Sequence, residues 1–264
     1  MWKLNNKNGV KFYTISSFED TGLVRHGFST REGGVSGGCY SSMNLRFHCD
    51  DDRQNVLKNY KIIADTLGMD YTRLVLSHQT HNDVIHTATE IDLGNGVTRD
   101  NAYESVDALI TDRLNIPLVT LYADCTPVYF LDPVKRVIAL AHSGWRGTVA
   151  RISAKVVHKM TADYGSNPSD ILTAIGPSIQ LKSFEVGDEV AEVFIREFGT
   201  ETAIKFGEKY HVDMQKAIRI QLEDAGVKHI DDCGIDTYEN SEFLFSHRKT
   251  NGRRGNMGAF LELI

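Results

Sequence analysis

The sequence has few cysteines and prolines and contains no long apolar run. Four scattered cysteines and five prolines in 264 residues exclude a disulfide framework and a proline-rich linker. The most apolar stretch, residues 117–131, is interrupted by Asp124 and Pro127 and is too short to span a bilayer. Residues 1–7 lack the apolar segment of a signal peptide. We therefore expect a soluble cytoplasmic protein with reduced thiols and no membrane partner.

The chain also lacks an excess of positive charge. Lysine and arginine total 29 against 35 acidic residues, which gives a formal net charge of −6. A nucleic-acid partner would need a net basic face, so none is expected, although a local pocket for one phosphate is still allowed. Hydrophobic residues make up 41% and charged residues 24%, as in an ordinary globular protein. With no repeat or low-complexity tract, residues 1–264 are expected to form one domain, for which a monomer is plausible.

Short runs of β-branched and aromatic residues outnumber the helical patterns. Between residues 73 and 141 there are six such strand candidates and no good helix. Strands and helices therefore do not alternate, which argues against a doubly wound parallel sheet. The pattern favours an α+β fold, in which helices cover a central β layer or sandwich. Later strands are expected at 171–175, 242–246 and 257–263.

Four segments are expected to be helical. Asp52 can cap a helix that runs to Leu67 and ends at Gly68, the usual left-handed stop. Apolar residues recur at intervals of three and four over 147–164, which predicts an amphipathic helix. Asp213 precedes a third apolar helical pattern. A fourth helix is expected over 188–198.

Reactive side chains follow the ends of three apolar strands. These are His81, Cys125 and His142, and strand ends place such groups on a rigid scaffold. One thiolate and two imidazoles suit Zn²⁺ and leave a fourth position open for water, as in a catalytic zinc site. The spacing alone also allows a metal-free nucleophile–base pair of Cys125 and His142. The third alternative is a purely structural one, in which the cysteine is buried in the core and the histidines are unrelated to it.

Other candidate residues have both a functional and a structural interpretation. Arg146 lies in a Gly-Trp-Arg-Gly turn before the predicted helix 147–164, whose free N–H groups could form an anion site with it. The same glycines could simply permit a tight turn. Asp124 could act as a general base or hydrogen-bond a neighbouring turn. Arg31 lies in a glycine-rich loop that could close over a phosphate, but the loop has no P-loop spacing.

Together the motifs resemble the YfiH-type family, also named the laccase-domain or polyphenol oxidoreductase family. The matching residues run from about Gly27 to the C-terminus. They are Phe28-Ser29-Thr30-Arg31-x-Gly33-Gly34-Val35-Ser36, Asn44-Leu45, His48-Cys49-x-Asp51, Gln79-x-His81, Asp107-Ala108-Leu109-Ile110-Thr111, Ala123-Asp124-Cys125-x-Pro127, Asp132-Pro133, Ala141-His142-x-Gly144-Trp145-Arg146-Gly147, Ile175-Gly176-Pro177-Ser178-Ile179 and Ser246-x-Arg248. The chain departs from the family pattern at Asn82, where glycine is usual, and at Ser143, where alanine is usual.

The resemblance implies a layered α/β/β/α fold, in which helices flank a central mixed β-sandwich, similar to cysteine-dependent toxin deamidases. It implies metal ligation by His81, Cys125 and His142. The family is reported to contain purine nucleoside phosphorylases that also deaminate adenosine. Some members are described as copper-dependent polyphenol oxidases, and others as peptidoglycan-precursor editing factors.

The residues favour the first of these activities. Laccases need a multinuclear copper cluster built from His-x-His pairs, and this chain has ten histidines but no such pair. We therefore expect a zinc enzyme that takes a purine nucleoside and phosphate, with copper as the second choice of metal. Cys125, His142 and Asp124 are the expected catalytic residues, and the expected substrate contacts are Arg31, Asn44, Gln79 and Arg146. A precursor-editing hydrolase and a non-catalytic metal-binding module remain alternatives.

Overall fold

The computed structural model describes all 264 residues and contains two six-stranded sheets, one three-stranded sheet and seven α-helices. The first sheet has the strand order β1-β2-β3-β15-β7-β4, with β1 Trp2–Lys7, β2 Val10–Ile15, β3 Val24–Ser29, β15 Met257–Leu263, β7 Leu118–Tyr122 and β4 Val75–Leu76. The second has the order β14-β10-β8-β9-β6-β5, with β14 His229–Asp232, β10 Leu172–Ile175, β8 Thr126–Asp132, β9 Val137–Ser143, β6 Ala108–Thr111 and β5 Ile85–Thr87. Both sheets mix parallel and antiparallel pairs, so the α+β prediction is confirmed.

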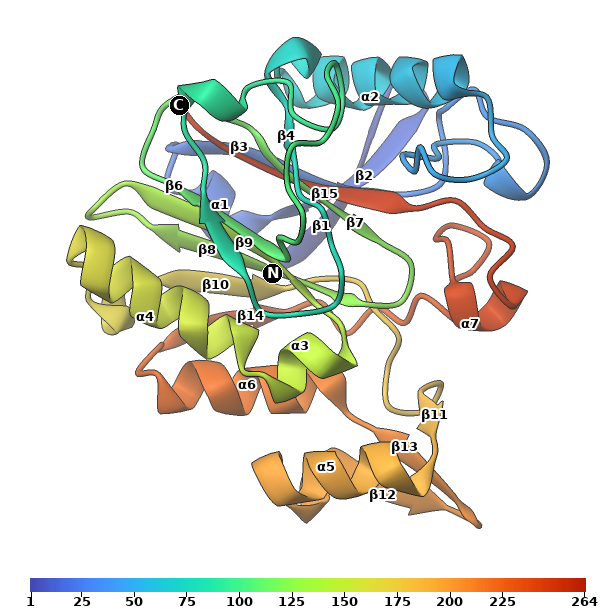
Figure 1. The fold of residues 1–264 in the computed structure, drawn as a ribbon, viewed down its shortest axis with the longest axis vertical. Coiled ribbons are helices and arrows are strands. Elements are labelled where there is room, and N and C mark those ends of the chain that lie inside the picture. The colour runs from blue at the N-terminus through green and yellow to red at the C-terminus, as the bar shows by residue number, and fades with distance from the viewer.

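The two large sheets pack face to face between helices (Figure 1). One apolar cluster fills the space between the sheets. A second cluster lies between the second sheet and its helices, and a third lies between the first sheet and its helix. Helix α2 (Arg53–Leu67) covers the first sheet, and helices α4 (Ile152–Tyr164) and α6 (Met214–Asp224) cover the second. Similarity to the toxin deamidases stays a prediction. The prediction that residues 1–264 form one domain also stays a prediction.

Strand β8 shows why the strands in the middle of the chain do not alternate between apolar and polar residues. Tyr129 and Leu131 face the inter-sheet cluster, whereas Val128 and Phe130 face helices α4 and α6. Both faces of the strand are therefore buried, and a strand buried on both faces is nearly continuously apolar.

Helix α2 follows the sequence signals at both ends. The Asp52 side chain accepts a hydrogen bond from the Gln54 N–H, and Gly68 ends the helix with a left-handed φ of 76°. These contacts satisfy backbone groups that a helix leaves unpaired at its ends.

Two element predictions are wrong. The helix expected over 147–164 is two helices, α3 (Trp145–Val149) and α4, because Arg151 adopts a left-handed φ of 60° between them. The strand expected over 242–246 is a turn in which the Leu244 N–H bonds to the Asn240 carbonyl. Its apolar residues Leu244 and Phe245 fill the inter-sheet cluster, so their apolar character reflects burial without a strand.

A smaller unit, absent from the sequence predictions except for its helix, projects beyond α6 (Figure 1). It contains β11 Glu185–Val186, α5 Asp188–Phe198, β12 Ala203–Phe206 and β13 Lys209–Val212. Phe194 and Phe198 anchor its own apolar cluster, to which α6 contributes Met214 and Ala217. The remaining helices, α1 (Ser16–Glu19) and α7 (His247–Thr250), are single turns, and no helix is long and apolar enough to cross a membrane.

Candidate active site

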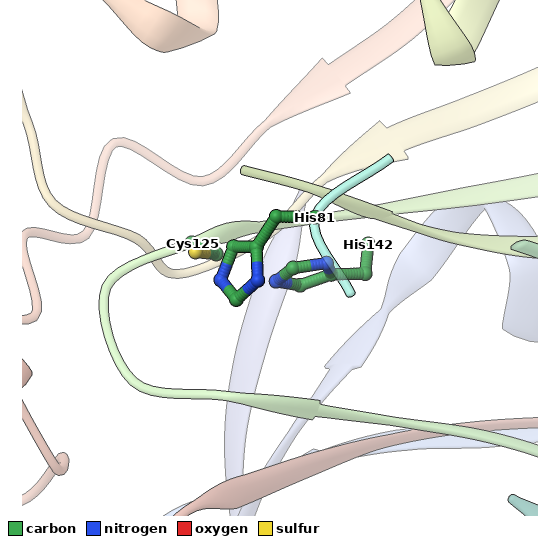
Figure 2. Close-up of side chains that lie close together, drawn as sticks. All are labelled: His81, Cys125 and His142. Carbon is green, nitrogen blue, oxygen red and sulfur yellow. The ribbon is translucent and has the colours of Figure 1, made fainter. Parts of the chain in front are cut away.

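The strand register brings His81, Cys125 and His142 together (Figure 2). Cys125 directly precedes β8, and the antiparallel pairing of β8 with β9 places Pro127 opposite His142. His81 lies in the loop after β4, which runs parallel to β7, and β7 leads through a short turn to Cys125. Three strand ends therefore deliver the three side chains to one place.

Their geometry suits a metal ion. One ligand atom from each residue lies within 4.8 Å of the other two, and this is the only such group of three in the chain. His142 is buried, Cys125 is half-buried and His81 is exposed, so the group is open on one side. The structure confirms that the three residues predicted from the strand ends could hold a metal ion.

Gly144 leaves the space that this group needs. A Cβ atom at this position would lie 2.9 Å from Cδ2 of His81 and 3.4 Å from Sγ of Cys125. The first distance is shorter than carbon atoms tolerate, so any side chain here would push the His81 ring away. The thiolate and imidazole donors, with this clearance beside them, fit a zinc or copper ion held by three protein ligands.

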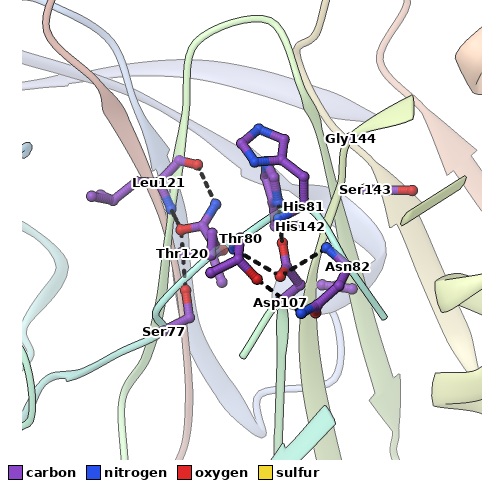
Figure 3. Close-up of polar contacts among 12 residues, drawn as sticks. Ser77, Thr80, His81, Asn82, Asp107, Thr120, Leu121, His142, Ser143 and Gly144 are labelled. Carbon is purple, nitrogen blue, oxygen red and sulfur yellow. Dashed lines mark hydrogen bonds and ion pairs between the residues drawn. The ribbon is translucent and has the colours of Figure 1, made fainter. Parts of the chain in front are cut away.

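Asp107 connects two of the ligands (Figure 3). Its buried carboxylate accepts hydrogen bonds from the backbone N–H groups of Thr80, His81 and Asn82, at 3.0 to 3.1 Å. It also lies 2.8 Å from Nδ1 of His142. Asp107 thus fixes the left-handed backbone at His81, whose φ is 65°, and leaves Nε2 of His142 free for a metal.

The charges in the group perturb its titration. Burial by itself would raise the pKa of the Cys125 thiol, but His142 and His81 outweigh it and lower the pKa. Burial would lower the pKa of His142, but Cys125 and Asp107 reverse the effect and raise it. A thiolate is the form in which cysteine binds a metal, so these shifts prepare Cys125 as a ligand.

Gln79 lines the cavity but uses its amide on the backbone. Its Nε2 donates to the Leu121 carbonyl at 2.7 Å, and its Oε1 accepts from the Leu121 N–H at 2.8 Å. The side chain thereby continues the pairing of the short strand β4 along β7. This contact fixes the start of the loop that carries His81.

The three ligands face a cavity of about 620 Å³. Its lining comes from six separate parts of the chain, near residues 46–53, 76–81, 96–101, 121–125, 142 and 254–256. Four arginines and one acidic residue, Asp100, line it: the arginines are Arg46, Arg53, Arg99 and Arg254. Such a volume is in the range of small-molecule sites, and the arginines make the cavity suited to an anion.

Two of the predicted substrate contacts lie away from this cavity. Arg31 donates to the backbone carbonyls of Ser41 and Ser241, and its guanidinium lies 4.6 Å from the centre of the Phe245 ring. Asn44 is fully buried and accepts from the N–H groups of Arg46 and Asn256. Neither lines the cavity, although Asn44 positions two residues that do.

Arg146 and Asp124 also lie outside the cavity lining. Arg146 is exposed and stacks 4.3 Å from the ring of Trp145, inside the five-residue helix α3. The carboxylate of Asp124 accepts hydrogen bonds from the Thr237 hydroxyl and from the Arg248 N–H, both at 2.7 Å. Asp124 thus holds the first turn of α7 close to Cys125, and its role as an acid or base stays a prediction.

Asp107 and the four cavity arginines were not assigned roles from the sequence. Asp107 begins the motif Asp107-Ala108-Leu109-Ile110-Thr111, directly before β6. A charged residue at the start of an apolar strand could have indicated its role in the site. No sequence signal indicated that the four arginines share one site. Each comes from a different loop or element, and only the folded chain places them in one cavity.

The chain is similar to known proteins along nearly its whole length. Residues 25–264 match the family described as Multi-copper polyphenol oxidoreductase laccase. The chain belongs to this family. Among curated members, the purine nucleoside phosphorylase YlmD of Bacillus subtilis is 34% identical over 242 residues, which cover 89% of this chain and 87% of YlmD.

Solved structures of laccase-family members have the same fold. The protein YfiH from Bacillus licheniformis superposes with a TM-score of 0.92 at 34% identity, and the match covers 99% of each chain. YlmD from Geobacillus stearothermophilus gives a TM-score of 0.90 at 31% identity over 98% of each chain. The α+β architecture of this chain is therefore that of the laccase-family structures.

Proposed function

We propose that this chain is a metal-dependent purine nucleoside phosphorylase that also deaminates adenosine. One observation carries the proposal: the only potential metal group, His81, Cys125 and His142, opens into a cavity lined by four arginines. The arginines suit the phosphate that phosphorolysis consumes. The names of the curated relatives support the same reaction class.

Phosphorolysis exchanges one bond for another at the ribose. A phosphate oxygen bonds to C1′ while the bond from C1′ to the purine nitrogen breaks, and the base leaves with a proton to give ribose 1-phosphate. Arg46 and Arg254 are our choice for the phosphate contacts, because both line the cavity that contains Cys125 and the buried Nε of Arg254 has no hydrogen-bond partner. Two guanidiniums can orient the anion and offset the charge that develops in the transition state.

His81, Cys125 and His142 would hold the metal, with zinc favoured by the donor set. Zinc with three protein ligands supplies Lewis acidity and acidifies water near neutral pH, which deamination at the purine C6 requires. Asp107 orients His142 and fixes the backbone of the His81 loop. We place this activity in the cytoplasm, where the four free cysteines would stay reduced.

Copper oxidation is the second candidate. A thiolate with two imidazoles also binds copper strongly, and the family description names copper. The chain offers one metal group, however, and no second cluster for the additional coppers that a laccase uses. Hydrolysis of a cell-wall precursor would use the same pair, Cys125 and His142, whereas a closed structural site would not leave His81 exposed beside a cavity.

The test is product analysis with zinc-loaded protein incubated with adenosine and phosphate. We expect adenine and ribose 1-phosphate to form only with phosphate, and inosine to form without it. Cys125→Ala should abolish all three products, and Cys39→Ala, at an exposed cysteine outside the cavity, should not. Absence of these products above the Cys125→Ala background would refute the proposal, and turnover of a precursor or a phenol instead would favour the alternatives.

A further inference from the structure

The cavity contains more fixed positive charge than one phosphate needs. Its lining has four guanidiniums but a single carboxylate, on a chain whose net charge is −6. None of the four forms an ion pair. The arginines that do pair with carboxylates lie elsewhere: Arg25, Arg113, Arg151, Arg196 and Arg219. Four unpaired guanidiniums in one cavity indicate a ligand with several negative charges.

Arg46 and Arg254 line the cavity together with the metal ligands. Arg254 is half-buried, and its Nε atom is buried without a hydrogen-bond partner. Burial lowers the pKa of Arg254, and Arg46 lowers it further by repulsion, whereas Cys125 opposes these effects. Arg254 thus lies within electrostatic range of both Arg46 and Cys125. One phosphate placed between them would relieve their repulsion and give the unpaired Nε a partner.

Arg53 and Arg99 line the same cavity and are each held by contacts that do not involve the metal ligands. The Arg53 guanidinium lies 4.7 Å from the centre of the Phe47 ring, which is itself stacked on Tyr60. Arg99 donates from Nη2 to the Ile91 carbonyl at 2.6 Å. Both guanidiniums are therefore held in place while most of their N–H groups stay free, so little entropy is lost when they bind an anion.

The loop that carries Arg99 is also fixed. Buried Asn95 donates to the Leu76 carbonyl and to Asn101, and accepts from the Ala102 N–H. Gly96 lines the cavity in a left-handed conformation, where a Cβ would lie 3.0 Å from that of Leu76. The backbone position of Arg99 is thus built into the fold.

We infer that Arg53 and Arg99 form a second anion subsite, so that the preferred substrate is a purine nucleoside that carries its own phosphate group. This inference rests on the proposed function. Phosphorolysis of such a nucleotide would form the bond from inorganic phosphate to C1′, break the bond from C1′ to the base, and release the base and ribose 1,5-bisphosphate. Arg46 and Arg254 would hold the attacking phosphate, and Arg53 and Arg99 the phosphate of the nucleotide.

The experiment compares kcat/KM for AMP and adenosine at fixed phosphate, using zinc-loaded protein. We expect AMP to be the better substrate. In Arg53→Gln and Arg99→Gln, the ratio of the AMP value to the adenosine value should fall about tenfold, chiefly through KM for AMP. Arg113→Gln, at an exposed arginine outside the cavity, is the matched control and should keep the wild-type ratio.

Two outcomes separate this inference from the proposed function. Turnover of adenosine but not AMP, or an unchanged ratio in both variants, would overturn the second subsite and leave the phosphorylase intact. If neither substrate reacts, calorimetric titration of the same proteins with AMP still tests the subsite. AMP should then bind more tightly than adenosine, more weakly at high salt, and about tenfold more weakly to Arg53→Gln. Equal binding of AMP by all the proteins would overturn it.

Discussion

Nδ1 of His142 lies 2.8 Å from a carboxylate oxygen of Asp107, a buried side chain that also receives three backbone N–H groups from the His81 loop. One carboxylate therefore fixes the position of two metal ligands that are far apart in the sequence. Burial by itself would raise the pKa of Asp107, but His142 and the backbone donors outweigh it and lower the pKa, so the group stays ionised.

Replacement of Asp107 should weaken metal binding. Asp107→Asn keeps the size but removes the charge that orients His142, and loss of such a partner typically lowers metal affinity about 10- to 100-fold. Competition with a chromophoric chelator measures the zinc affinity. Asp112→Asn, at a half-exposed carboxylate five residues further along, is the control. Equal zinc affinities of the Asp107 variant and the wild type would contradict the role of Asp107.

A methyl group at Gly144 should displace His81. The added Cβ would lie 2.9 Å from Cδ2 of His81, and misplacement of a site group by about 1 Å can lower activity about a hundredfold. We expect Gly144→Ala to lose zinc affinity and adenosine phosphorolysis while its circular dichroism spectrum stays native. Gly37→Ala, where nothing lies within 4 Å of the new atom, is the matched control. An active Gly144→Ala enzyme would show that this clearance is not required.

Replacement of a cavity arginine should raise the KM for phosphate more than replacement of Arg146, which lies outside the cavity. Arg254→Gln removes a guanidinium from the cavity, so the KM for phosphate should rise at least about tenfold. Arg146→Gln tests the contact expected from the sequence, and its effect should be smaller because Arg146 lies outside the lining. Phosphate titrations at saturating adenosine measure both. A larger effect of Arg146→Gln would restore the anion site expected at the Gly-Trp-Arg-Gly turn.

His26 should make the fold sensitive to acid. Burial lowers its pKa to about 4, and its Nε2 accepts a hydrogen bond from the Ile15 N–H at 2.8 Å. The unfolded chain binds the proton near its ordinary pKa of about 6.5, so stability falls as the pH drops from about 6.5 to 4, by about 3 kcal/mol. His26→Gln can still accept the hydrogen bond and does not titrate.

Urea unfolding of the wild type and of His26→Gln between pH 7 and pH 4 measures this effect. The free energy of unfolding of the wild type should fall more steeply than that of the variant across this range. Parallel pH profiles would show that His26 does not carry the sensitivity.

Local signals predicted the elements that local contacts define. The bounds of β15 and α5, and the caps of α2, agree with the sequence patterns because strand burial and helix capping act over a few residues. The break at Arg151 and the turn before Phe245 were missed. An apolar pattern records which residues are buried and does not record where the backbone changes direction.

The candidate site was predicted in part for the same reason. The three metal ligands follow strand ends, which the sequence shows, and the resemblance to the family names the same trio. The cavity arginines depend on the meeting of loops near residues 46, 99 and 254, which only tertiary structure supplies. Arg31 and Asn44 belong to motifs of the family, yet their hydrogen bonds hold the loops around the cavity together.

Phosphorolysis by this protein should require one metal ion held by His81, Cys125 and His142. The most direct measurement is titration of metal-depleted protein with zinc while phosphate-dependent release of adenine from adenosine is followed. We predict that activity rises with added zinc, reaches a plateau at one zinc per chain, and stays at background in Cys125→Ala. Full activity of the metal-depleted protein, or zinc-stimulated activity in Cys125→Ala, would contradict this metal requirement.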